Sequence, residues 1–235
     1  MSDSDPRAWP LTLTRSLEKF PIANQALDDW FATPGSTLEA MFADCRFPWD
    51  LLAINEAIVG ALTESQIDGE VHPSAVIEGH VKIGERTRIL PGVFIEGNVV
   101  IGEGCKIGPN CYIRGNTSIG NNCHIGQSVE IKNCIILDDT NIGHLSYVGD
   151  SILGEKVNLG AGTMVSNFRH DGENHRSMVE GELVDTGRRK FGTIIGDGVH
   201  TGIGTLIYPG RKIWPGMSTR PGEVVAKDLR TVEKI

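Results

Sequence analysis

The stretch that decides the fold covers residues 95–125 and reads IEGNVVIGEGCKIGPNCYIRGNTSIGNNCHI. An aliphatic residue occupies every sixth position, and the same spacing extends back to Val71 and forward to Ile131. A period of six matches neither the 3.6-residue period of an amphipathic helix nor the two-residue alternation of a strand. It is typical of a hexapeptide repeat that winds a parallel β-helix. We therefore predict a mainly β solenoid, in which three hexads form one coil and coils stack about 4.8 Å apart.

The repeat also predicts which side chains face the core. We expect the first and fifth residues of each hexad to point inward and the others to lie outside or at corners. Cys105, Cys111 and Cys123 occupy the fifth position, where a buried thiol behaves as a small hydrophobic group. No Cys-x-x-Cys or histidine-rich cluster points to a metal site, so we expect no metal and no disulfide.

The repeat is interrupted once. We expect it to continue beyond Ile131, with two five-residue steps, at Leu137, Ile142, Val148, Leu153, Leu159 and Val165, and to resume at Ile195, Thr201, Ile207, Ile213, Thr219 and Val225. The polar residues 166–192 between these runs predict an excursion from the solenoid, with a hairpin around Glu180 and Gly181. Long interruptions of this kind are usually functional or disordered, and we favour function.

The sequence thus divides into three parts. Residues 1–70 lack the six-residue period. Ser36 and Glu39 resemble a capping box and predict a helix over residues 37 to about 44, and apolar spacing predicts a second helix over residues 50–62. We interpret this part as a small helical cap or linker remnant, because the open end of a solenoid needs cover. Residues 71–225 are the solenoid, and residues 226–235 are a tail, either a short helix or a loose end.

Charge and hydropathy narrow the function classes. The net charge of −8 argues against a general affinity for nucleic acid or an anionic membrane. The sequence has no apolar run of about 18 residues and no charged-then-apolar leader. We therefore expect a cytoplasmic protein that acts on a small molecule.

Two cations are predicted to stack on neighbouring coils. Arg114 and Lys132 are 18 residues apart, and each directly follows a repeat isoleucine. Like charges about 5 Å apart repel unless an anion or a carboxylate lies between them. Glu130 is one possible partner, and a bound phosphate is the other; the spacing does not choose between them.

A histidine is predicted to lie beside bare backbone. His144 is the third residue of its hexad and points outward, and the residue one coil above it is Ala161, between two glycines. A titratable imidazole next to an unobstructed surface is a place where a substrate can lie. Tyr147 and Asn158 end nearby hexads, and they offer a hydroxyl and an amide suited to a sugar.

These residues belong to a familiar pattern. The segments GHLSYVGD at 143–150 and VNLGAGT at 157–163 resemble the acetyltransferase domain of bifunctional enzymes that acetylate glucosamine 1-phosphate and then uridylylate it. With GRRK at 187–190, the chain is most similar to archaeal-type sugar-1-phosphate nucleotidylyltransferase/acetyltransferases. The resemblance implies a left-handed winding, a homotrimer with sites between adjacent solenoids, and acetyl-CoA as co-substrate.

The resemblance implies a role for each site residue. By this resemblance, His144 is the catalytic base and Asn167 lies near the reacting amine. Arg114 and Lys132 bind the sugar phosphate, together with Lys190 from a neighbouring subunit. Tyr147 and Asn158 contact the sugar, and Ala161 contacts the acetyl-CoA arm. Phe168 stands where the bacterial enzymes have tyrosine. Ile203 fills a place where a smaller residue lines the coenzyme path. Separately, Arg211, Lys212 and Arg220 are candidates for the phosphates of coenzyme A or ordinary surface charges.

The predicted function is therefore N-acetyl transfer from acetyl-CoA to the amine of an amino-sugar 1-phosphate. An imidazole can accept the amine proton near neutral pH, and backbone N–H groups at residues 160–162 or Asn167 can stabilise the thioester oxyanion. The glycine-rich nucleotide loop has no counterpart, so we expect no nucleotidylyltransferase activity. Two alternatives stay open: acyl transfer to another sugar or nucleotide-sugar, and a non-catalytic binding or assembly module. A zinc hydratase needs three converging histidines and is disfavoured, because His124 and His144 lack a third.

Overall fold

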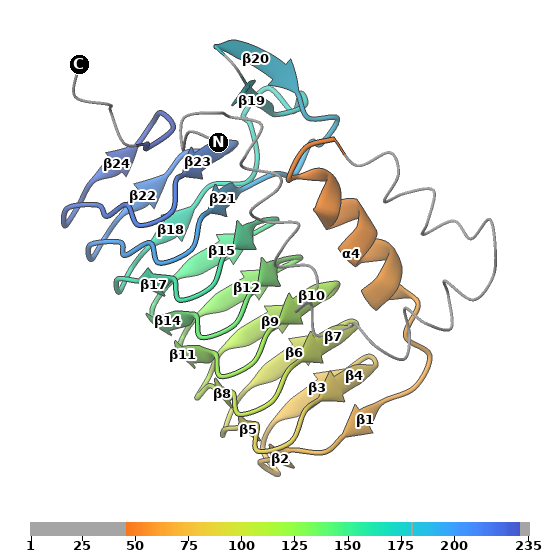
Figure 1. Ribbon diagram of the computed structural model, residues 1–235. Helices are drawn as coiled ribbons and strands as arrows, with labels where there is room; N and C mark the ends of the chain where they lie inside the picture. The colour runs from red at the N-terminus through yellow and green to blue at the C-terminus, as the bar shows by residue number, and fades with distance from the viewer. Residues whose placement is uncertain (1–45, 180, 231–235) are drawn as a thin grey trace.

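Parallel strands from successive coils build three long sheets in this computed structural model, which describes residues 46–179 and 181–230 (Figure 1). Sheet A contains β1 (Gln66–Ile67), β4 (Val81–Ile83), β7 (Val99–Ile101), β10 (Thr117–Ile119), β13 (Ile135–Ile136), β16 (Ile152–Leu153), β21 (Thr193–Ile195) and β23 (Arg211–Ile213). Sheet B contains β2 (Glu70–Val71), β5 (Arg88–Ile89), β8 (Lys106–Ile107), β11 (His124–Gln127), β14 (Asn141–His144) and β17 (Asn158–Leu159). Sheet C contains β3 (Val76–Glu78), β6 (Phe94–Glu96), β9 (Tyr112–Arg114), β12 (Glu130–Lys132), β15 (Tyr147–Gly149), β18 (Met164–Val165), β22 (Leu206–Ile207) and β24 (Val224–Val225).

The predicted mainly β solenoid is confirmed: the chain visits the three sheets in turn and adds one strand to each per coil. From Val81 onward, the aliphatic first and fifth positions of the hexads are buried in one continuous core, as the repeat predicts, and Val71, Ala75 and Ile77 of the first coil are partly buried against it. Cys105, Cys111 and Cys123 are buried free thiols in that core, and burial raises the pKa of Cys111 to about 12. The cysteines are therefore packing residues.

One repeat position differs from the prediction. Ile136, and not Leu137, pairs with Ile119 on the coil below and Leu153 on the coil above. Ile136 fills the solenoid core, and Leu137 packs in a second cluster on the outside of sheet A. The first five-residue step therefore comes one hexad earlier than predicted. Both adjacent residues are aliphatic, so the spacing alone does not distinguish them.

The second cluster is formed by α4 (Asp50–Gly60), which the sequence predicts over residues 50–62. Its apolar residues pack with Val100, Ile135 and Ile152 on the outer face of sheet A. Figure 1 shows α4 lying along this flank. The described part of the N-terminal segment thus covers a side of the solenoid, where a cap over its open end was expected. The helix predicted over residues 37–44 lies outside the described residues.

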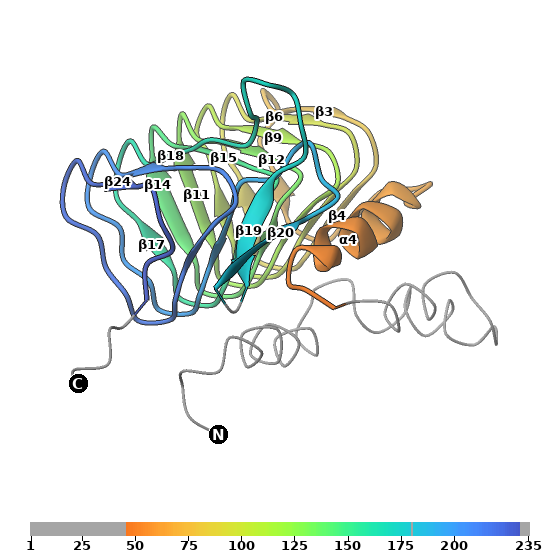
Figure 2. The same ribbon diagram turned by 90° about the horizontal axis from the view of Figure 1, so that it is seen from above.

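The excursion forms the predicted hairpin. β19 (Arg176–Val179) and β20 (Glu182–Asp185) pair antiparallel, and they lie on the same side of the solenoid as α4 (Figure 2). Phe191, at the end of the excursion, is buried against Trp49 before α4, with ring centroids 5.9 Å apart. The excursion and the N-terminal segment therefore share one apolar cluster.

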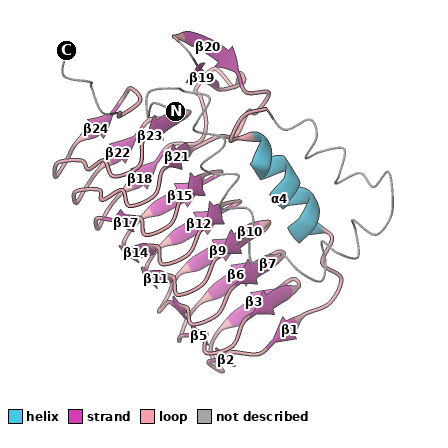
Figure 3. Ribbon diagram, in the orientation of Figure 1, coloured by secondary structure: helices cyan, strands magenta, loops and turns pink. Residues whose placement is uncertain are grey.

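The ends of the solenoid differ from the predicted limits by a few residues. Pairing starts at Gln66, which is opposite Lys82, five residues before Val71. Described residues 226–230 contain no helix (Figure 3). Leu229 forms a parallel bridge with Ile213, so the start of the predicted tail continues the pairing of sheet A.

Candidate functional site

Sheet C carries the two stacked cations. Lys132 pairs in register with Arg114 across β12 and β9, as the 18-residue spacing predicts. Arg114 Nη1 lies 3.3 Å from Glu130 Oε1, and Arg114 Nε lies 3.8 Å from Glu96 Oε2. Two carboxylates thus offset the charge of Arg114, and one of them is Glu130, which the sequence indicates as a possible partner. Among residues 46–179 and 181–230, the second terminal nitrogen of this guanidinium makes no hydrogen bond or ion pair.

Asp150 is the carboxylate that pairs with Lys132, a contact that the spacing of the repeat does not predict. Its side chain is 2% exposed and lies 3.2 Å from Lys132 Nζ. Asn167 Nδ2 donates to Asp150 Oδ2 at 2.5 Å, and Asn133 Nδ2 donates to Asp150 Oδ1 at 2.9 Å. Asn167 Nδ2 also donates to Tyr147 Oη at 3.0 Å. We call these five residues the Asp150 hub.

The hub is separate from the imidazole of His144: within residues 46–179 and 181–230 no hydrogen bond joins the side chains of Asp150 and His144. Asn167 was a candidate oxyanion donor, but both hydrogens of its amide are already used by Asp150 and Tyr147.

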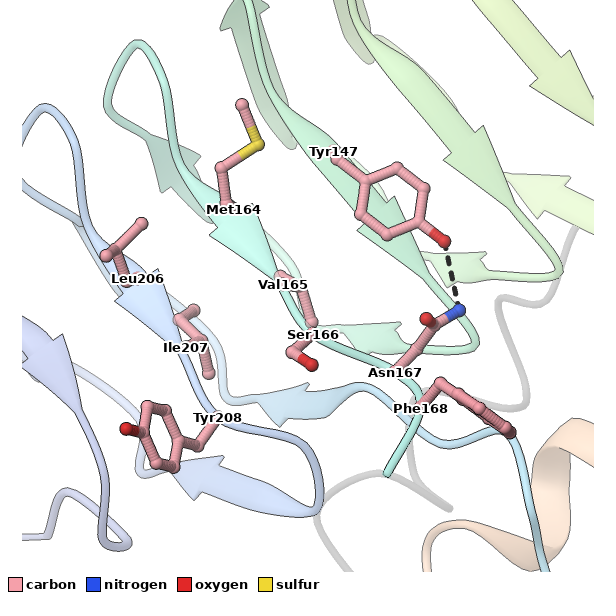
Figure 4. Close-up of a pocket in the computed structure, with 9 residues that line it drawn as sticks. All are labelled: Tyr147, Met164, Val165, Ser166, Asn167, Phe168, Leu206, Ile207 and Tyr208. Atoms are coloured by element: carbon pink, nitrogen blue, oxygen red, sulfur yellow. Dashed lines mark hydrogen bonds between the residues drawn. The ribbon is translucent and has the colours of Figure 1, made fainter. Parts of the chain in front are cut away.

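A pocket of about 380 Å³ lies beside the hub on the outer face of sheet C. Its wall is made of Tyr147, Met164, Val165, Ser166, Asn167, Phe168, Leu206, Ile207 and Tyr208. Figure 4 shows the hydrogen bond between Asn167 Nδ2 and Tyr147 Oη in the wall of this pocket. Burial, followed by the charge of Asp150, raises the pKa of Tyr147. The phenol is therefore neutral and can act as both donor and acceptor.

Met164, Ser166, Leu206 and Tyr208 line this pocket without having been predicted as site residues. Met164 and Leu206 pair with one another in register, and Tyr147 pairs with Met164. Each of these three residues directly precedes an inward aliphatic residue. Tyr147, Met164 and Leu206 thus share one position in the hexad. This shared position is the sequence signal that could have identified Met164 and Leu206 as site residues.

Lys190 lies at the edge of the pocket within its own chain. Its Nζ is 4.0 Å from the centre of the Phe168 ring, and the two residues form an antiparallel bridge. The resemblance implied a lysine supplied by a neighbouring subunit. Here the excursion brings Lys190 back beside Asn167, whose carbonyl accepts the N–H of Phe191 at 3.1 Å.

His144 lies at the corner between sheets B and C, as predicted. Its side chain is exposed, and its carbonyl accepts the N–H of Gly162 at 3.2 Å. The carbonyl of Ala161 in turn accepts the N–H of Gly204 at 2.8 Å, so these corners stack directly. The predicted imidazole and its glycine-flanked ledge are therefore adjacent.

Not all predicted site residues converge on the pocket. Asn158 is exposed on sheet B, where it pairs with Asn141 and bridges to His200. Ile203 lies one coil above Ala161 and is 62% exposed. Arg220 is exposed farther along, where its N–H is bonded to Glu223. Within a single chain, Asn158, Ile203 and Arg220 thus lie along sheet B and its corner with sheet C, whereas the hub and the pocket lie on sheet C.

Lys212 is excluded as an exposed contact for coenzyme phosphates. Its Nζ is buried between Asp228 Oδ2, at 3.2 Å, and Ser177 Oγ, at 3.1 Å. It also faces the rings of Trp49 and Trp214. Burial lowers the pKa of this ammonium, and Asp228 opposes the effect. Lys212 therefore fastens the hairpin and the N-terminal segment to the solenoid.

The described residues contain neither a membrane-spanning helix nor a cluster of metal-binding side chains. No helix in residues 46–179 and 181–230 combines the length and apolar character that a bilayer span needs. The same part of the chain has no group of three or more histidine, cysteine, aspartate or glutamate side chains placed to hold a metal ion.

Curated relatives match most of this chain but only part of their own. A bifunctional sugar-1-phosphate nucleotidylyltransferase/acetyltransferase of Sulfurisphaera tokodaii is 42% identical over 191 residues, which are 81% of this chain and 48% of that protein. The bifunctional protein GlmU of Methanococcus aeolicus is 39% identical over 204 residues, which are 85% of this chain and 49% of that protein. The chain thus spans about half the length of these relatives.

Solved structures and a family model complete the comparison. The polysialic-acid-specific acetyltransferase NeuO is 17% identical with a TM-score of 0.42, covering 72% of this chain and 80% of its own. The model described as the GMPPB C-terminal domain matches residues 95–215. That segment holds more than half of the 235 residues and includes the hub and the pocket. The chain therefore belongs to the family of the GMPPB C-terminal domain.

Proposed function

We propose that this protein transfers the acetyl group of acetyl-CoA to the amine of an amino-sugar 1-phosphate. The observation that carries the proposal is the position of the Asp150 hub and its pocket. They lie across one corner of the solenoid from the exposed side chain of His144, which is next to the backbone of residues 160–162. The names of the relatives support the same class of reaction. The chain matches about half the length of these relatives, and the proposal for this chain covers the acetyl transfer only.

His144 is the proposed general base. As the sugar nitrogen attacks the thioester carbonyl, the imidazole takes the proton that the nitrogen loses. The tetrahedral intermediate then collapses, the carbon–sulfur bond breaks, and the imidazolium returns the proton to the departing thiolate. The products are the N-acetylated sugar and coenzyme A.

The N–H of Ala161 is the proposed oxyanion donor. Along the ledge, the N–H of Gly162 is bonded to the carbonyl of His144, and the N–H of Gly160 is bonded to Thr201 Oγ1 at 2.9 Å. Within the described residues, the N–H of Ala161 has no such partner. A donor that is already fixed in place needs no reorganisation when charge develops on the thioester oxygen.

The hub and the pocket would hold the acceptor. Asn167 Oδ1 would receive a hydrogen bond from the amine, and Tyr147 would meet a sugar hydroxyl. The free donors of Arg114 and Lys132 would meet the phosphate, with Lys190 at the edge of the pocket. Fixing the phosphate turns binding energy into orientation of the amine.

Coenzyme A release measures this function directly. We expect thiol release with glucosamine 1-phosphate or galactosamine 1-phosphate as acceptor, and loss of at least about 100-fold in kcat for His144→Ala. His80→Ala removes an exposed histidine from a distant coil and is expected to keep full turnover. If neither sugar releases coenzyme A, the proposed reaction is wrong; if His144→Ala retains kcat, the assigned base is wrong.

A larger acceptor is the second candidate, because the pocket carries exposed aromatic rings. Tyr208 is 53% exposed and Phe168 is 41% exposed, and Phe168 lacks the hydroxyl of the bacterial tyrosine. Such rings favour stacking with a nucleotide base. Faster coenzyme A release with a nucleotide-linked amino sugar than with either sugar 1-phosphate would favour this candidate.

A homotrimer is part of the proposal, because the single chain leaves the site open. The histidine and the ledge are exposed, and sheet C presents the uncovered side chains of Met164, Leu206 and Val224 in one row. A neighbouring solenoid against this face would bury the row and enclose the pocket between two chains.

A further inference from the structure

Glu56 of α4 is connected to the Asp150 hub through one amide. Asn133 Nδ2 donates to Glu56 Oε1 at 2.8 Å and to Asp150 Oδ1 at 2.9 Å. Asn133 directly follows Lys132, whose Nζ binds the same Asp150 carboxylate. A side chain of the N-terminal helix therefore bonds one member of the hub directly and is two hydrogen bonds away from Asp150.

Two carboxylates hold this amide in the described part of the chain. Asn133 is 9% exposed, and its Oδ1 is buried with no hydrogen-bond partner among the described residues. Rotating the amide would point that oxygen at both carboxylates, which offer no donor when ionised. The two hydrogens of Nδ2 are thus fully used, and the position of Asn133 depends on Glu56 as much as on Asp150.

Glu56 is itself held in place. Arg188, at the end of the excursion, donates to the same Oε1 that accepts from Asn133. The apolar residues of α4 are buried against sheet A, so the helix presents this carboxylate from a rigid element. A carboxylate fixed by packing and by a second hydrogen bond can position its neighbours.

Loss of Asn133 from the hub would move the ammonium of Lys132. Asp150 Oδ1 accepts from Asn133 at 2.9 Å and from Lys132 Nζ at 3.5 Å, whereas Asp150 Oδ2 lies 3.2 Å from the same Nζ. Without the amide, Oδ1 is a buried anionic oxygen with Lys132 as its remaining donor. The ammonium would then be drawn toward Oδ1 and away from an acceptor outside the hub.

We propose that Glu56 is a positioning residue for the acceptor site, acting through Asn133 and Asp150 on Lys132. The proposal rests on the function proposed above for its kinetic readout only. It makes the geometry of the site dependent on the N-terminal helix, which is 77 residues away from Asn133 in the sequence. Glu56 does not touch the substrate in this scheme.

The kinetic test uses Glu56→Ala, Asn133→Ala and the double variant in the full chain. We expect each single variant to raise KM for the amino-sugar 1-phosphate about 5- to 20-fold, which corresponds to about 1–2 kcal/mol, with KM for acetyl-CoA unchanged. The double variant is expected to be no worse than Asn133→Ala, because both substitutions break one chain of contacts. Glu56→Gln keeps an oxygen acceptor toward Asn133 and is expected to restore most of the affinity. Glu64→Ala, an exposed glutamate just beyond α4, is the matched control and should leave both KM values unchanged.

The outcomes separate positioning from general stability. A helix that merely loosens would lower the active fraction and kcat while leaving KM for the acceptor unchanged, and that result overturns the proposal. Independent, additive effects of the two substitutions overturn it as well. A crystal structure of Glu56→Ala gives a readout that needs no activity: Asn133 Nδ2 displaced from Asp150 supports the proposal, and an unchanged hub refutes it. If the unmodified chain turns over no amino-sugar phosphate, the proposed function fails and this structure alone decides about Glu56.

Discussion

At the scale of single residues, Asp150 explains why several predicted site residues hold their positions. A buried carboxylate is costly unless donors surround it, and here Lys132, Asn133 and Asn167 supply them. The backbone of Asp150 adopts a left-handed conformation with φ of 50°, which aspartate tolerates better than most residues. The turn after β15 therefore aims the carboxylate into the hub.

Asp150→Asn tests this role through stability. The NH2 of the new amide would face the NH2 of either Asn133 or Asn167, donor against donor, and the Lys132 ammonium would lose its carboxylate. We expect the free energy of unfolding to fall by about 2–4 kcal/mol, measured by urea denaturation. Asp68→Asn changes an exposed aspartate whose carboxylate, among the described residues, accepts a hydrogen bond from the Gln66 side chain alone. This control is expected to stay within about 0.5 kcal/mol of the unmodified chain, and equal losses in the two variants would contradict the role of Asp150.

His175 predicts the pH dependence of stability below neutrality. Burial lowers the pKa of this histidine, and the hydrogen bond to the Asn167 carbonyl partly opposes the shift. The unfolded chain therefore takes up a proton near pH 6.5 while the folded chain does not, so stability falls as the pH drops below that value. The slope reaches at most about 1.4 kcal/mol per pH unit for one proton.

Denaturation at pH 5 and pH 7 measures that slope. His175→Gln is expected to flatten it, whereas His80→Gln, an exposed site, should leave it unchanged. A remaining slope would come from His124, whose pKa is also lowered, first by burial and then by Lys106. A slope that His175→Gln does not reduce would show that the imidazole titrates normally in the folded protein.

At the scale of elements, α4 and the excursion share the outer face of sheet A. Sheet A presents an apolar row to α4, while polar contacts fix the position of the helix along that row. Asn55 Nδ2 donates to the carbonyl of Asn116 at 2.6 Å, and Ser118 Oγ donates to Asn55 Oδ1 at 2.6 Å. These buried contacts set the register of the helix, and the register is what brings Glu56 to Asn133.

Asn55→Ala is expected to lower the free energy of unfolding by about 1–3 kcal/mol, because it leaves a buried carbonyl and hydroxyl unpaired. In the double variant with Ser118→Ala the combined loss should be smaller than the sum, since the hydroxyl is then no longer stranded. Chemical denaturation measures both. Additive losses would indicate that the two side chains do not depend on each other.

At the scale of the whole molecule, the uncovered row on sheet C is the proposed interface between copies of this chain. Leu206 is 44% exposed between Met164 and Val224, and exposed apolar patches of this kind mark interaction surfaces. We expect sedimentation equilibrium to give about three copies of the unmodified chain. Leu206→Asp should shift the protein toward single chains, because it places a charge in the buried centre of the interface.

Leu183→Asp is the matched control for this experiment. Leu183 is 49% exposed on the hairpin strand β20, away from sheet C. This variant is expected to keep the association state of the unmodified chain. Dissociation by Leu183→Asp but not by Leu206→Asp would place the interface on the hairpin side instead.

The sequence by itself determined the solenoid, its core and the stacking of residues on neighbouring coils. A six-residue period is a local rule, so the registers of Arg114 with Lys132 and of His144 with Ala161 follow from counting. The six-residue spacing gave the wrong inward residue at one place, where the aliphatic residues Ile136 and Leu137 are adjacent. There the choice depends on which residue faces α4, and a periodic pattern carries no information about that partner.

Only the tertiary structure decided how the polar side chains are connected. The contacts of Glu56 with Asn133 and Arg188 span 77 and 132 residues, and no spacing rule reaches that far. They exist because burial of apolar residues docks α4 and the excursion onto sheet A, and docking then brings their polar side chains within hydrogen-bonding distance. Periodicity therefore fixed each residue's place on the solenoid, while long-range packing chose its partners.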